Sequence, residues 1–276
     1  MKIYLVPNFE KEKTKEIFFE TTKILIDLGV EIFVSDKSIA NNDYILLNEN
    51  EAFYDCDYVV VIGGDGTIIH TAKKAAVYNK AVLGINCGRV GYLAGLEPQN
   101  IDKLSCFVNK EFKIESRNIL KATFENNDSI LSLPFLNDAV VTRGSISRMI
   151  DISVGFGDSC VDYRADGVII STATGSTAYS MAAGGPIVDP ELNALLVTPI
   201  SAYSLSNKPL VLKNSEQLTI INNSEANNDV FISVDGENSY KINSGKKVII
   251  SNSSLTAKII KIDNISFFAT LSDKLS

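Results

Sequence analysis

Residues 58–69 read YVVVIGGDGTII, and the fold of the chain can be worked out from this stretch. The β-branched residues 59–62 predict a buried strand of a parallel sheet. The glycines that follow end the strand, and Thr67 is placed to cap a helix that runs through Ala72. A strand, a glycine turn and a helix N-terminus direct free backbone N–H groups and the positive end of a helix dipole at one spot, where a phosphate can bind.

Asp65 makes this loop unusual, because a carboxylate repels bound phosphates. We therefore expect Asp65 to hold a metal ion or to accept a proton from an attacking hydroxyl group. For the loop alone a structural alternative stays open, in which Gly63, Gly64 and Gly66 make only a tight turn that Asp65 caps. His70 is the only histidine, so a catalytic base is expected to be a carboxylate.

The composition is that of an ordinary soluble globular protein, with 45% hydrophobic and 21% charged residues and a mean hydropathy of +0.11. No apolar run approaches the roughly 18 residues of a membrane span, and the first apolar stretch is too short for a secretion signal, so we expect a cytoplasmic protein with no membrane partner. The net charge of −7 argues against a protein that coats nucleic acid. The cysteines lack any CxxC spacing, which argues against a zinc site or a disulfide framework.

Residues 1–110 predict an α/β domain. Strand patterns alternate with helical patterns, which is typical of a parallel sheet with crossover helices. The expected strands are 2–7, 30–34, 58–62 and 81–86, and the expected helices are 10–28, 67–79 and 98–108.

Residues 86–93, NCGRVGYL, form a second glycine-bearing strand exit. Two such exits from neighbouring parallel strands line one crevice at the carboxyl edge of a sheet. Arg89 is a candidate phosphate contact, although a solvated loop arginine is at least as good an interpretation, and Tyr92 is a candidate for binding the ligand.

Residues 111–255 predict a second, antiparallel all-β domain, because short alternating segments are separated by turn residues. The expected strands are 112–124, 130–135, 139–142, 150–156, 168–171, 218–222, 230–234 and 247–250. Residues 257–263 and 265–275 predict a strand and a helix, so that residues 256–276 return to the first domain.

Asn137 and Asp138 stand at the start of one of these strands. An asparagine side chain offers a donor and acceptors that suit a purine or ribose edge, and the neighbouring carboxylate can accept a hydrogen bond from a sugar hydroxyl group. Taken alone, an Asx turn that leads into the strand explains the pair better.

Residues 166–186, DGVIISTATGSTAYSMAAGGP, are the most informative stretch. They predict a strand, a hydroxyl-rich turn and a short helix of small residues that ends at paired glycines and a proline. Small residues let a flat ring approach the backbone, with Tyr179 available to pack against it. Helix capping needs one or two hydroxyl groups, so a surplus of donors indicates a polar ligand. The hydroxyl residues are Ser171, Thr172, Thr174, Ser176 and Thr177.

Together, the loop at 63–67, the Asn137–Asp138 pair and the stretch 166–186 resemble the NAD kinases, in the same order and at similar spacing, over nearly the whole chain. The glycine–aspartate loop is also found in diacylglycerol kinases, sphingosine kinases and phosphofructokinases. The TGSTAYS turn at 174–180 is much more specific.

The resemblance implies an enzyme that phosphorylates the 2′-hydroxyl group of the adenosine ribose of NAD, using ATP or another nucleoside triphosphate with a divalent metal such as Mg²⁺. It implies a Rossmann-like α/β nucleotide-binding domain and a β-sandwich-like, NAD-binding domain. The family assembles as dimers or tetramers, so a homodimer or homotetramer is expected.

The same resemblance implies that Asp65 lies at the reacting hydroxyl group as the general base, beside donor phosphates cradled by the glycine loop. The pair at 137 and 138 holds the adenosine side of NAD, and Asp166 lies near the nicotinamide amide across a subunit boundary. The binding residues expected are Gly63, Gly64, Gly66, Thr67, Tyr92, Asn137, Asp138, Asp166, Thr174, Thr177, Ala178 and Tyr179, and no side chain is assigned as a metal ligand.

Three positions depart from the family pattern. Asp138 is one methylene shorter than the usual Glu, which shifts the ribose geometry slightly. Ala173 replaces a usual Pro and removes a rigid turn residue. Tyr203 stands where many members have His, so contacts at that position are open.

Two other functions fit parts of the pattern. A lipid kinase has the same glycine loop but is expected to offer a basic or apolar membrane-facing surface, and this acidic chain has no evident basic cluster. If the protein were a non-catalytic NAD(P)-binding sensor, its intact Asp65 loop would be hard to explain.

Overall fold

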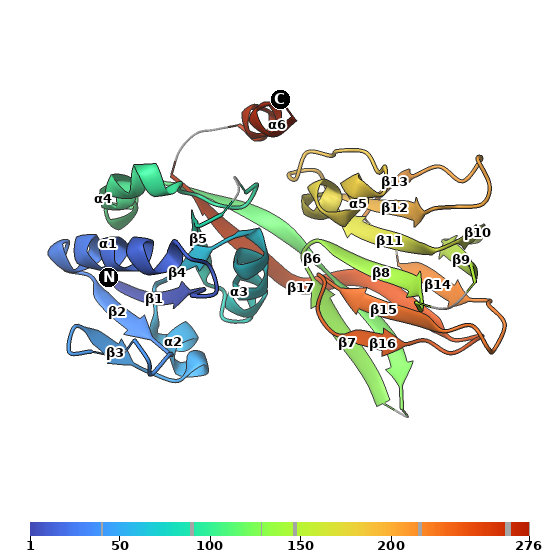
Figure 1. Ribbon diagram of the computed structural model, residues 1–276, viewed down its shortest axis with the longest axis horizontal. Helices are drawn as coiled ribbons and strands as arrows, with labels where there is room; N and C mark the ends of the chain where they lie inside the picture. Colours follow the sequence, from blue (N-terminus) through green and yellow to red (C-terminus); the bar gives the residue numbers. More distant parts are fainter. Residues whose placement is uncertain are drawn as a thin grey trace. The chain divides into compact units, whose positions relative to one another are not determined.

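The computed structural model describes residues 1–39, 41–88, 91–127, 129–145, 148–214, 217–262 and 266–275 (Figure 1). The chain forms two compact units: Met1–Ser116 with Thr256–Ser276, and Arg117–Leu255. No helix in the described ranges has both the length and the apolar character needed to cross a membrane.

The first unit is built on a parallel sheet with the strand order β17, β5, β4, β1, β2, β3. The order β3, β2, β1, β4, β5 is that of a doubly wound nucleotide-binding fold, so the Rossmann-like prediction is confirmed. The elements are β1 (Lys2–Pro7), α1 (Thr14–Asp27), β2 (Glu31–Val34), β3 (Tyr44–Leu46), α2 (Glu49–Asp55), β4 (Tyr58–Gly63), α3 (Asp65–Val77), β5 (Ala81–Asn86), the 3₁₀ helix η1 (Pro98–Lys103), α4 (Leu104–Val108), α6 (Phe267–Leu275) and the last residues of β17 (Lys247–Lys261).

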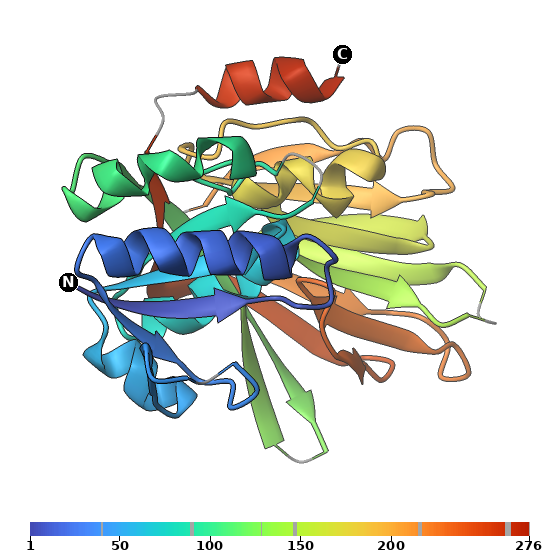
Figure 2. The ribbon, with the colours of Figure 1, turned by 60° about the vertical axis from the view of Figure 1, so that its left-hand side comes forward.

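Helices α1 and α4 cover one face of this sheet (Figures 1 and 2). Ile17, Phe18 and Leu25 of α1 pack into one core with Leu104 and Phe107. The same core contains every second residue of β1 and β4, because successive side chains of a strand point to opposite faces. The apolar residues at helical spacing within 10–28 therefore form this buried face, although the helix itself begins only at residue 14.

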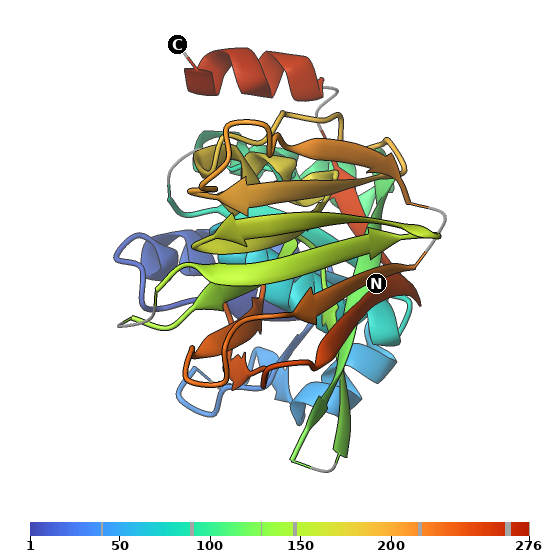
Figure 3. The ribbon, with the colours of Figure 1, turned by 90° about the vertical axis from the view of Figure 1, so that its right-hand side faces the viewer.

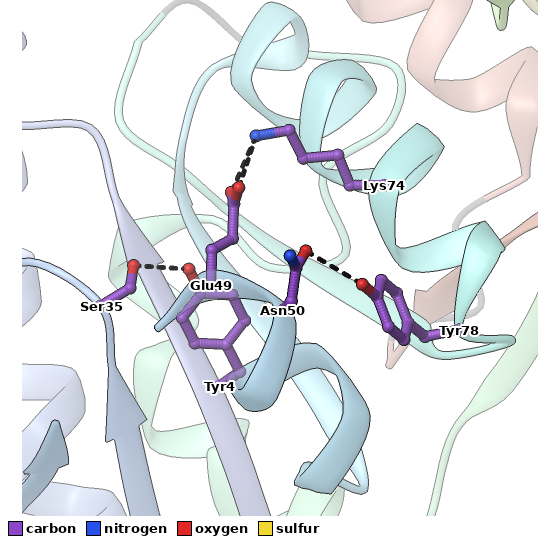
Figure 4. Close-up of polar contacts among 6 residues, drawn as sticks. All are labelled: Tyr4, Ser35, Glu49, Asn50, Lys74 and Tyr78. Atoms are coloured by element: carbon purple, nitrogen blue, oxygen red, sulfur yellow. Dashed lines mark hydrogen bonds and ion pairs between the residues drawn. The ribbon is translucent and has the colours of Figure 1, made fainter. Parts of the chain in front are cut away.

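Helices α2 and α3 cover the opposite face. Ile68 of α3 lies so close to Gly84 of β5 that a Cβ atom there would collide with it, and the ring of Phe53 meets the ring of Tyr4 edge-on at 5.0 Å. Polar contacts also join α2 to α3 and its C-cap residue, and β1 to the residue that follows β2 (Figure 4). They join Tyr4 Oη to Ser35 Oγ at 2.7 Å, Lys74 Nζ to Glu49 Oε1 at 2.8 Å, and Tyr78 Oη to Asn50 Oδ1 at 3.0 Å.

The second unit is a β-sandwich, as the resemblance implied. One layer has the strand order β13, β12, β11, β8, β15, β16 with antiparallel neighbours (Figure 3). The other layer contains β10, β9, β14 and β17, with β6 and β7 beside β17. Inward residues of both layers share one core, for example Val141 and Val168 from the first layer and Ile152 and Ile220 from the second.

Most elements of the second unit are short strands, and β6 and β17 are the two long ones. The elements are β6 (Lys113–Asn126), β7 (Ser129–Phe135), β8 (Asp138–Arg143), β9 (Ile150–Phe156), β10 (Ser159–Ala165), β11 (Gly167–Thr172), the 3₁₀ helix η2 (Thr174–Thr177), α5 (Tyr179–Ala182), β12 (Ala194–Ile200), β13 (Leu210–Lys213), β14 (Leu218–Asn222), β15 (Val230–Val234), β16 (Ser239–Lys241) and most of β17.

The structure contains elements that the sequence does not predict. These are strands β3, β10, β12, β13 and β16 and helix α2, and residues 247–261 form one long strand rather than two. The first compact unit ends at Ser116, inside β6, rather than near residue 110. Residues 263 and 265, the predicted end of a strand and start of a helix, lie outside the described residues.

Candidate active site

The glycine loop lies at the point where the strand order of the first unit reverses. The chain passes from β1 to β2 on one side and from β4 to β5 on the other, and β1 and β4 are neighbours. In open α/β sheets, ligands bind at such a switch point, outside the carboxyl ends of the strands. The stretch Gly63–Gly64–Asp65–Gly66 runs from the last residue of β4 into the first turn of α3 and therefore occupies this position.

The helix after the loop begins earlier than predicted. α3 starts at Asp65 with Gly64 as its N-cap residue, and no side chain caps it. The capping role predicted for Thr67 is wrong, because Thr67 already belongs to the first turn and its Oγ1 accepts a hydrogen bond from Asn8 Nδ2 at 2.9 Å. The first N–H groups of a helix have no intrahelical acceptor, so the start of α3 remains suited to an anion.

The carboxylate of Asp65 is held by the second strand exit. Its Oδ2 accepts a hydrogen bond from the N–H of Tyr92 at 2.8 Å, and its Oδ1 accepts one from the N–H of Leu93 at 3.3 Å. Gly91 makes this approach possible, because a Cβ atom at that position would collide with the carboxylate. Backbone groups that follow β5 thus orient both oxygens of Asp65, which stays partly accessible to solvent.

Tyr92 also contacts two residues near the C-terminal end of the chain. Its carbonyl oxygen accepts a hydrogen bond from Lys261 Nζ at 3.1 Å, and its ring lies 6.0 Å from the ring of Phe267. Burial raises the pKa of the Tyr92 hydroxyl, and the Asp65 carboxylate raises it further. The structure therefore gives Tyr92 a direct part in positioning Asp65. Sequence reasoning missed Lys261, which has no local signal because its partners lie in another part of the chain.

The two strand exits lie side by side. Gly63 and Asn86 are partners in the pairing of β4 with β5, and the N–H of Cys87 donates to the Gly63 carbonyl oxygen at 3.0 Å. This confirms the expectation that the exits come from neighbouring parallel strands. Arg89, the candidate phosphate contact, lies outside the described residues.

In the second unit, the Asn137–Asp138 pair and the TGSTAYS turn are in direct contact. A Cβ atom on Gly175 would collide with the backbone of Asn137, so only glycine permits the approach. The N–H of Thr172 donates to the Asn137 carbonyl oxygen at 2.9 Å, and Thr172 Oγ1 donates to the Leu136 carbonyl oxygen at 2.6 Å. Two motifs separated in sequence therefore form one polar surface.

The hydroxyl groups of this turn are mostly used inside the protein. Ser171 Oγ donates to the Thr172 carbonyl oxygen, Thr172 Oγ1 also accepts from the N–H of Gly175, and Ser176 Oγ bonds both backbone groups of Val188. Thr177 Oγ1 reaches the Thr174 carbonyl oxygen at 3.4 Å. Four of these hydroxyl groups therefore shape the turn itself and are not surplus donors.

The predicted contact residues of the turn differ in how far they are exposed to solvent. Tyr179 has 47% of its surface exposed, and Thr177 and Ala178 are partly exposed, whereas Thr174 is buried. The turn therefore offers a ligand mainly the segment from Thr177 to Tyr179.

Asp138 is a buried acid, with 5% of its surface exposed. Burial raises its pKa from 3.8 to about 7, the Asp235 carboxylate adds to the rise, and a hydrogen bond from the N–H of Tyr179 opposes it. This carboxyl group therefore changes charge near neutral pH, beside the segment that contains Tyr179.

Asp235 fixes the backbone of the pair. Its Oδ1 accepts hydrogen bonds from the N–H groups of Asn137 at 2.8 Å and Asp138 at 3.1 Å, and its Oδ2 accepts one from Leu136 at 2.9 Å. Sequence reasoning missed this residue. The Asp235–Gly236 dipeptide after an alternating strand signals a hairpin turn, but nothing local indicates partners 97 to 99 residues earlier.

Asp166 does not join this cluster within one chain. It precedes β11, where Gly167 pairs with Thr142, whereas Asp138 pairs with Ser171 at the other end of the strand. At about 3.3 Å per residue, the two ends of such a strand are well over 10 Å apart. The carboxylate of Asp166 instead accepts a hydrogen bond from Arg143 Nε at 2.7 Å.

The departures at Ala173 and Tyr203 have different consequences. Ala173 has φ = −59°, a value that proline also adopts, so the turn keeps its conformation without the rigid residue. Tyr203 lies at the surface with 75% of its area exposed, beside a cavity of about 560 Å³ that Asp162 and Arg164 also line.

No cluster of three His, Cys, Asp or Glu side chains in the described part of the chain could form a metal cage. Mg²⁺ is usually held by one or two carboxylates together with substrate phosphates rather than by a cage of side chains. A single carboxylate on a phosphate-binding loop, Asp65, therefore fits a Mg²⁺ ion that arrives with a nucleoside triphosphate.

Comparison with protein families covers nearly the whole chain. The ATP-NAD kinase N-terminal domain family matches residues 3–112, and the ATP-NAD kinase C-terminal domain family matches residues 136–262.

The similar sequences and solved structures include NAD kinases and an NADH kinase. The NAD kinase of Caldanaerobacter subterraneus subsp. tengcongensis is 35% identical over 280 residues, covering 100% of this chain and 99% of that protein. The NAD kinase of Treponema denticola is 37% identical, covering 99% and 95%. A crystal structure of yeast NADH kinase complexed with NADH has a TM-score of 0.86 at 25% identity, covering 100% of this chain and 87% of the other. An Archaeoglobus fulgidus NAD kinase structure in complex with ATP has a TM-score of 0.79 at 27% identity, covering 100% and 98%.

Proposed function

This chain belongs to the NAD kinase family, a family of phosphotransferases, and we propose that it transfers the γ-phosphoryl group of ATP to the 2′-hydroxyl group of the adenosine ribose of NAD, with Asp65 as the general base. The observation that carries the role of Asp65 is its placement. The carboxylate stands at the N-terminus of α3, in the phosphate-binding loop, and two backbone N–H groups hold it there.

The first unit binds the donor. The glycine loop of Gly63, Gly64 and Gly66 leads into α3, whose first N–H groups supply donors for phosphate oxygens. Thr67 completes the loop through its contact with Asn8 rather than by capping the helix.

The second unit binds NAD. Asn137 and Asp138 recognise the adenosine side, and Thr174, Thr177, Ala178 and Tyr179 form the adjoining wall of the site. The contact between Gly175 and Asn137 supports this assignment, because it makes the two motifs one surface. Tyr92 contributes by orienting Asp65 through its backbone N–H group.

The chemical step depends mainly on position and charge. Phosphoryl transfer passes through a loose transition state, so the hydroxyl proton leaves late. Asp65 accepts that proton, and the N–H groups of Tyr92 and Leu93 keep the carboxylate in the orientation that accepts it. A Mg²⁺ ion held with ATP at the Asp65 loop would supply positive charge that offsets the repulsion between Asp65 and the phosphates.

The active protein is proposed to be a homodimer or homotetramer. Asp166 lies at the end of β11 remote from Asp138, so it reaches a nicotinamide ring only in the site of a second copy. Nearby, Tyr203 and Leu205 have 75% and 87% of their surfaces exposed, which suits a subunit interface. We place the protein in the cytoplasm, in keeping with its ordinary soluble composition. Light scattering after size-exclusion chromatography measures the subunit number, and a monomer that retains full activity contradicts this assembly.

Incubation of the protein with NAD, ATP and Mg²⁺, followed by an assay for NADP, tests the function directly. When diacylglycerol or sphingosine is added to this mixture, a lipid kinase phosphorylates the lipid and leaves NAD unchanged. A sensor binds NAD without making NADP.

Replacement of Gly91 by Ala is expected to lower kcat by about 10- to 100-fold, because displacement of a catalytic group by about 1 Å costs this much. The new methyl group forces the Asp65 carboxylate away from the N–H groups of Tyr92 and Leu93. Steady-state kinetics should show a fall in kcat with little change in the KM for NAD.

The matched control is Gly155→Ala in β9, where a Cβ atom meets only ordinary contacts at 3.7 Å or more. It should keep kcat within about twofold, since surface and unstrained substitutions have small effects. An unchanged kcat in Gly91→Ala would show that the orientation of Asp65 is unimportant.

A further inference from the structure

Lys11 belongs to none of the motifs described above, yet its side chain reaches two of them. It stands between β1 and α1, where its N–H contacts the Asn8 carbonyl oxygen at 3.4 Å. A Cβ atom on Gly64 would collide with Lys11 Nζ, and a Cβ atom on Gly88 would lie 3.0 Å from it. The ammonium group therefore occupies the space that a side chain would need at each of these glycines.

The sheet topology explains this position. Lys11 follows β1, Gly64 follows β4 and Gly88 follows β5, and these three strands are adjacent in the sheet. The reversal of strand order falls between β1 and β4. The ammonium group thus lies at the carboxyl edge of the sheet, where a ligand of this fold class binds.

Lys11 has no ion-pair partner in the described part of the chain. Within the ranges that the structure describes, no side chain or backbone group forms a hydrogen bond or ion pair with Lys11 Nζ. The charge does act locally: burial raises the pKa of the Cys87 thiol, and the Lys11 ammonium opposes that rise. Lys11 is only partly exposed, whereas Lys13, two residues later, is exposed.

We propose that Lys11 is a binding residue for the outer phosphate groups of the nucleoside triphosphate, an inference that rests on the proposed function. The N–H groups at the start of α3 are directional donors but carry only partial charge, and Asp65 adds a full negative charge to the loop. A lysine ammonium supplies a compact positive charge with three donors that can follow the phosphate oxygens. Lys11 therefore offsets the repulsion between Asp65 and the donor.

Lys11→Met removes the charge and keeps most of the side-chain length. Loss of one hydrogen bond to a charged group should raise the KM for ATP by about 10- to 100-fold. The KM for NAD should change little, because NAD is bound by the second unit. Lys11→Arg keeps the charge and should recover most of the ATP affinity, which a purely structural role of the side chain would not require.

Lys13→Met is the matched control, because it removes the same charge from an exposed neighbour in the same turn. Its KM for ATP should stay within about twofold of the unaltered protein. Titration calorimetry with inorganic tripolyphosphate provides a second measurement that does not depend on turnover. Tripolyphosphate should bind more weakly to Lys11→Met than to Lys13→Met, and the difference should shrink as salt is added.

The outcomes separate the two proposals. If the unaltered protein makes no NADP, the proposed function fails, and weaker tripolyphosphate binding by Lys11→Met still supports the anion-binding role. If the protein makes NADP and Lys11→Met equals Lys13→Met in both ATP KM and tripolyphosphate affinity, the role of Lys11 is overturned while the function stands.

Discussion

Asp65→Asn should lower the kcat for NADP formation by about 10²- to 10⁴-fold, the usual contribution of a positioned general base. The amide cannot accept the ribose proton, whereas the glycine loop and the NAD-binding residues of the second unit are unchanged. NAD should therefore bind with nearly the same affinity. Coupled assays of NADP formation measure the first quantity, and titration calorimetry with NAD measures the second.

The structure also predicts a secondary effect of this substitution. Both oxygens of Asp65 accept hydrogen bonds from backbone N–H groups, and an asparagine side chain has only one acceptor oxygen. One N–H group therefore loses its partner, which costs about 1–3 kcal/mol. Thermal unfolding of the variant shows whether this cost unfolds the loop or the whole unit.

Asp27→Asn is the control, because Asp27 is an exposed residue at the end of α1 in the same unit. It should leave both kcat and NAD binding unchanged. If Asp65→Asn forms NADP as fast as this control, Asp65 is not the general base.

Asp138→Asn is expected to change how the stability of the second unit depends on pH. The pKa of Asp138 is raised from 3.8 to about 7 in the folded protein, chiefly by burial and then by Asp235. Between these two values the folded state holds a proton that the unfolded state has lost, so stability falls as pH rises from about 4 to about 7. Above about 7 the carboxyl group is ionised in both states, and the full cost of the buried charge is present.

The size of the effect follows from the two pKa values. At about 1.4 kcal/mol for each factor of ten in the proton equilibrium, raising the pH from 5 to 8 should cost the unaltered protein on the order of 3 kcal/mol at this site. Asparagine stays neutral at both pH values and can still accept from the N–H of Tyr179. Urea unfolding at pH 5 and pH 8 should therefore show a smaller pH effect in Asp138→Asn, and an identical pH effect in both proteins would refute the assignment.

The same group links pH to ligand binding. A ribose hydroxyl group donates best to the ionised carboxylate, so NAD affinity should increase as pH rises through about 7. Asp138→Asn should bind NAD about 10-fold more weakly at pH 8, since a hydrogen bond to a charged group is lost. A KM for NAD that is independent of pH between 6 and 8 would show that Asp138 does not take part in ribose recognition.

The secondary-structure errors have identifiable causes. Strand β12 contains Pro199, and proline normally argues against a strand within a sheet, yet this residue pairs with Val168. Strand β10 begins directly at the predicted turn and most of its residues are exposed, so it lacks an alternating apolar pattern. Strand β17 crosses the polar residues 251–254, which looked like a break, but β6 pairs with it and supports its length.

The sequence by itself determined the parallel α/β pattern, the antiparallel β domain, the two glycine exits and the family. These are local properties, because the spacing of apolar side chains, the glycine turns and the motifs each depend on a few consecutive residues. Only the tertiary structure decided that Thr67 bonds Asn8 instead of capping α3, that Tyr92 and Leu93 orient Asp65, and that Asp235 fixes Asn137. Each of these contacts joins residues far apart in the chain, and which distant groups meet depends on how the strands pair and pack.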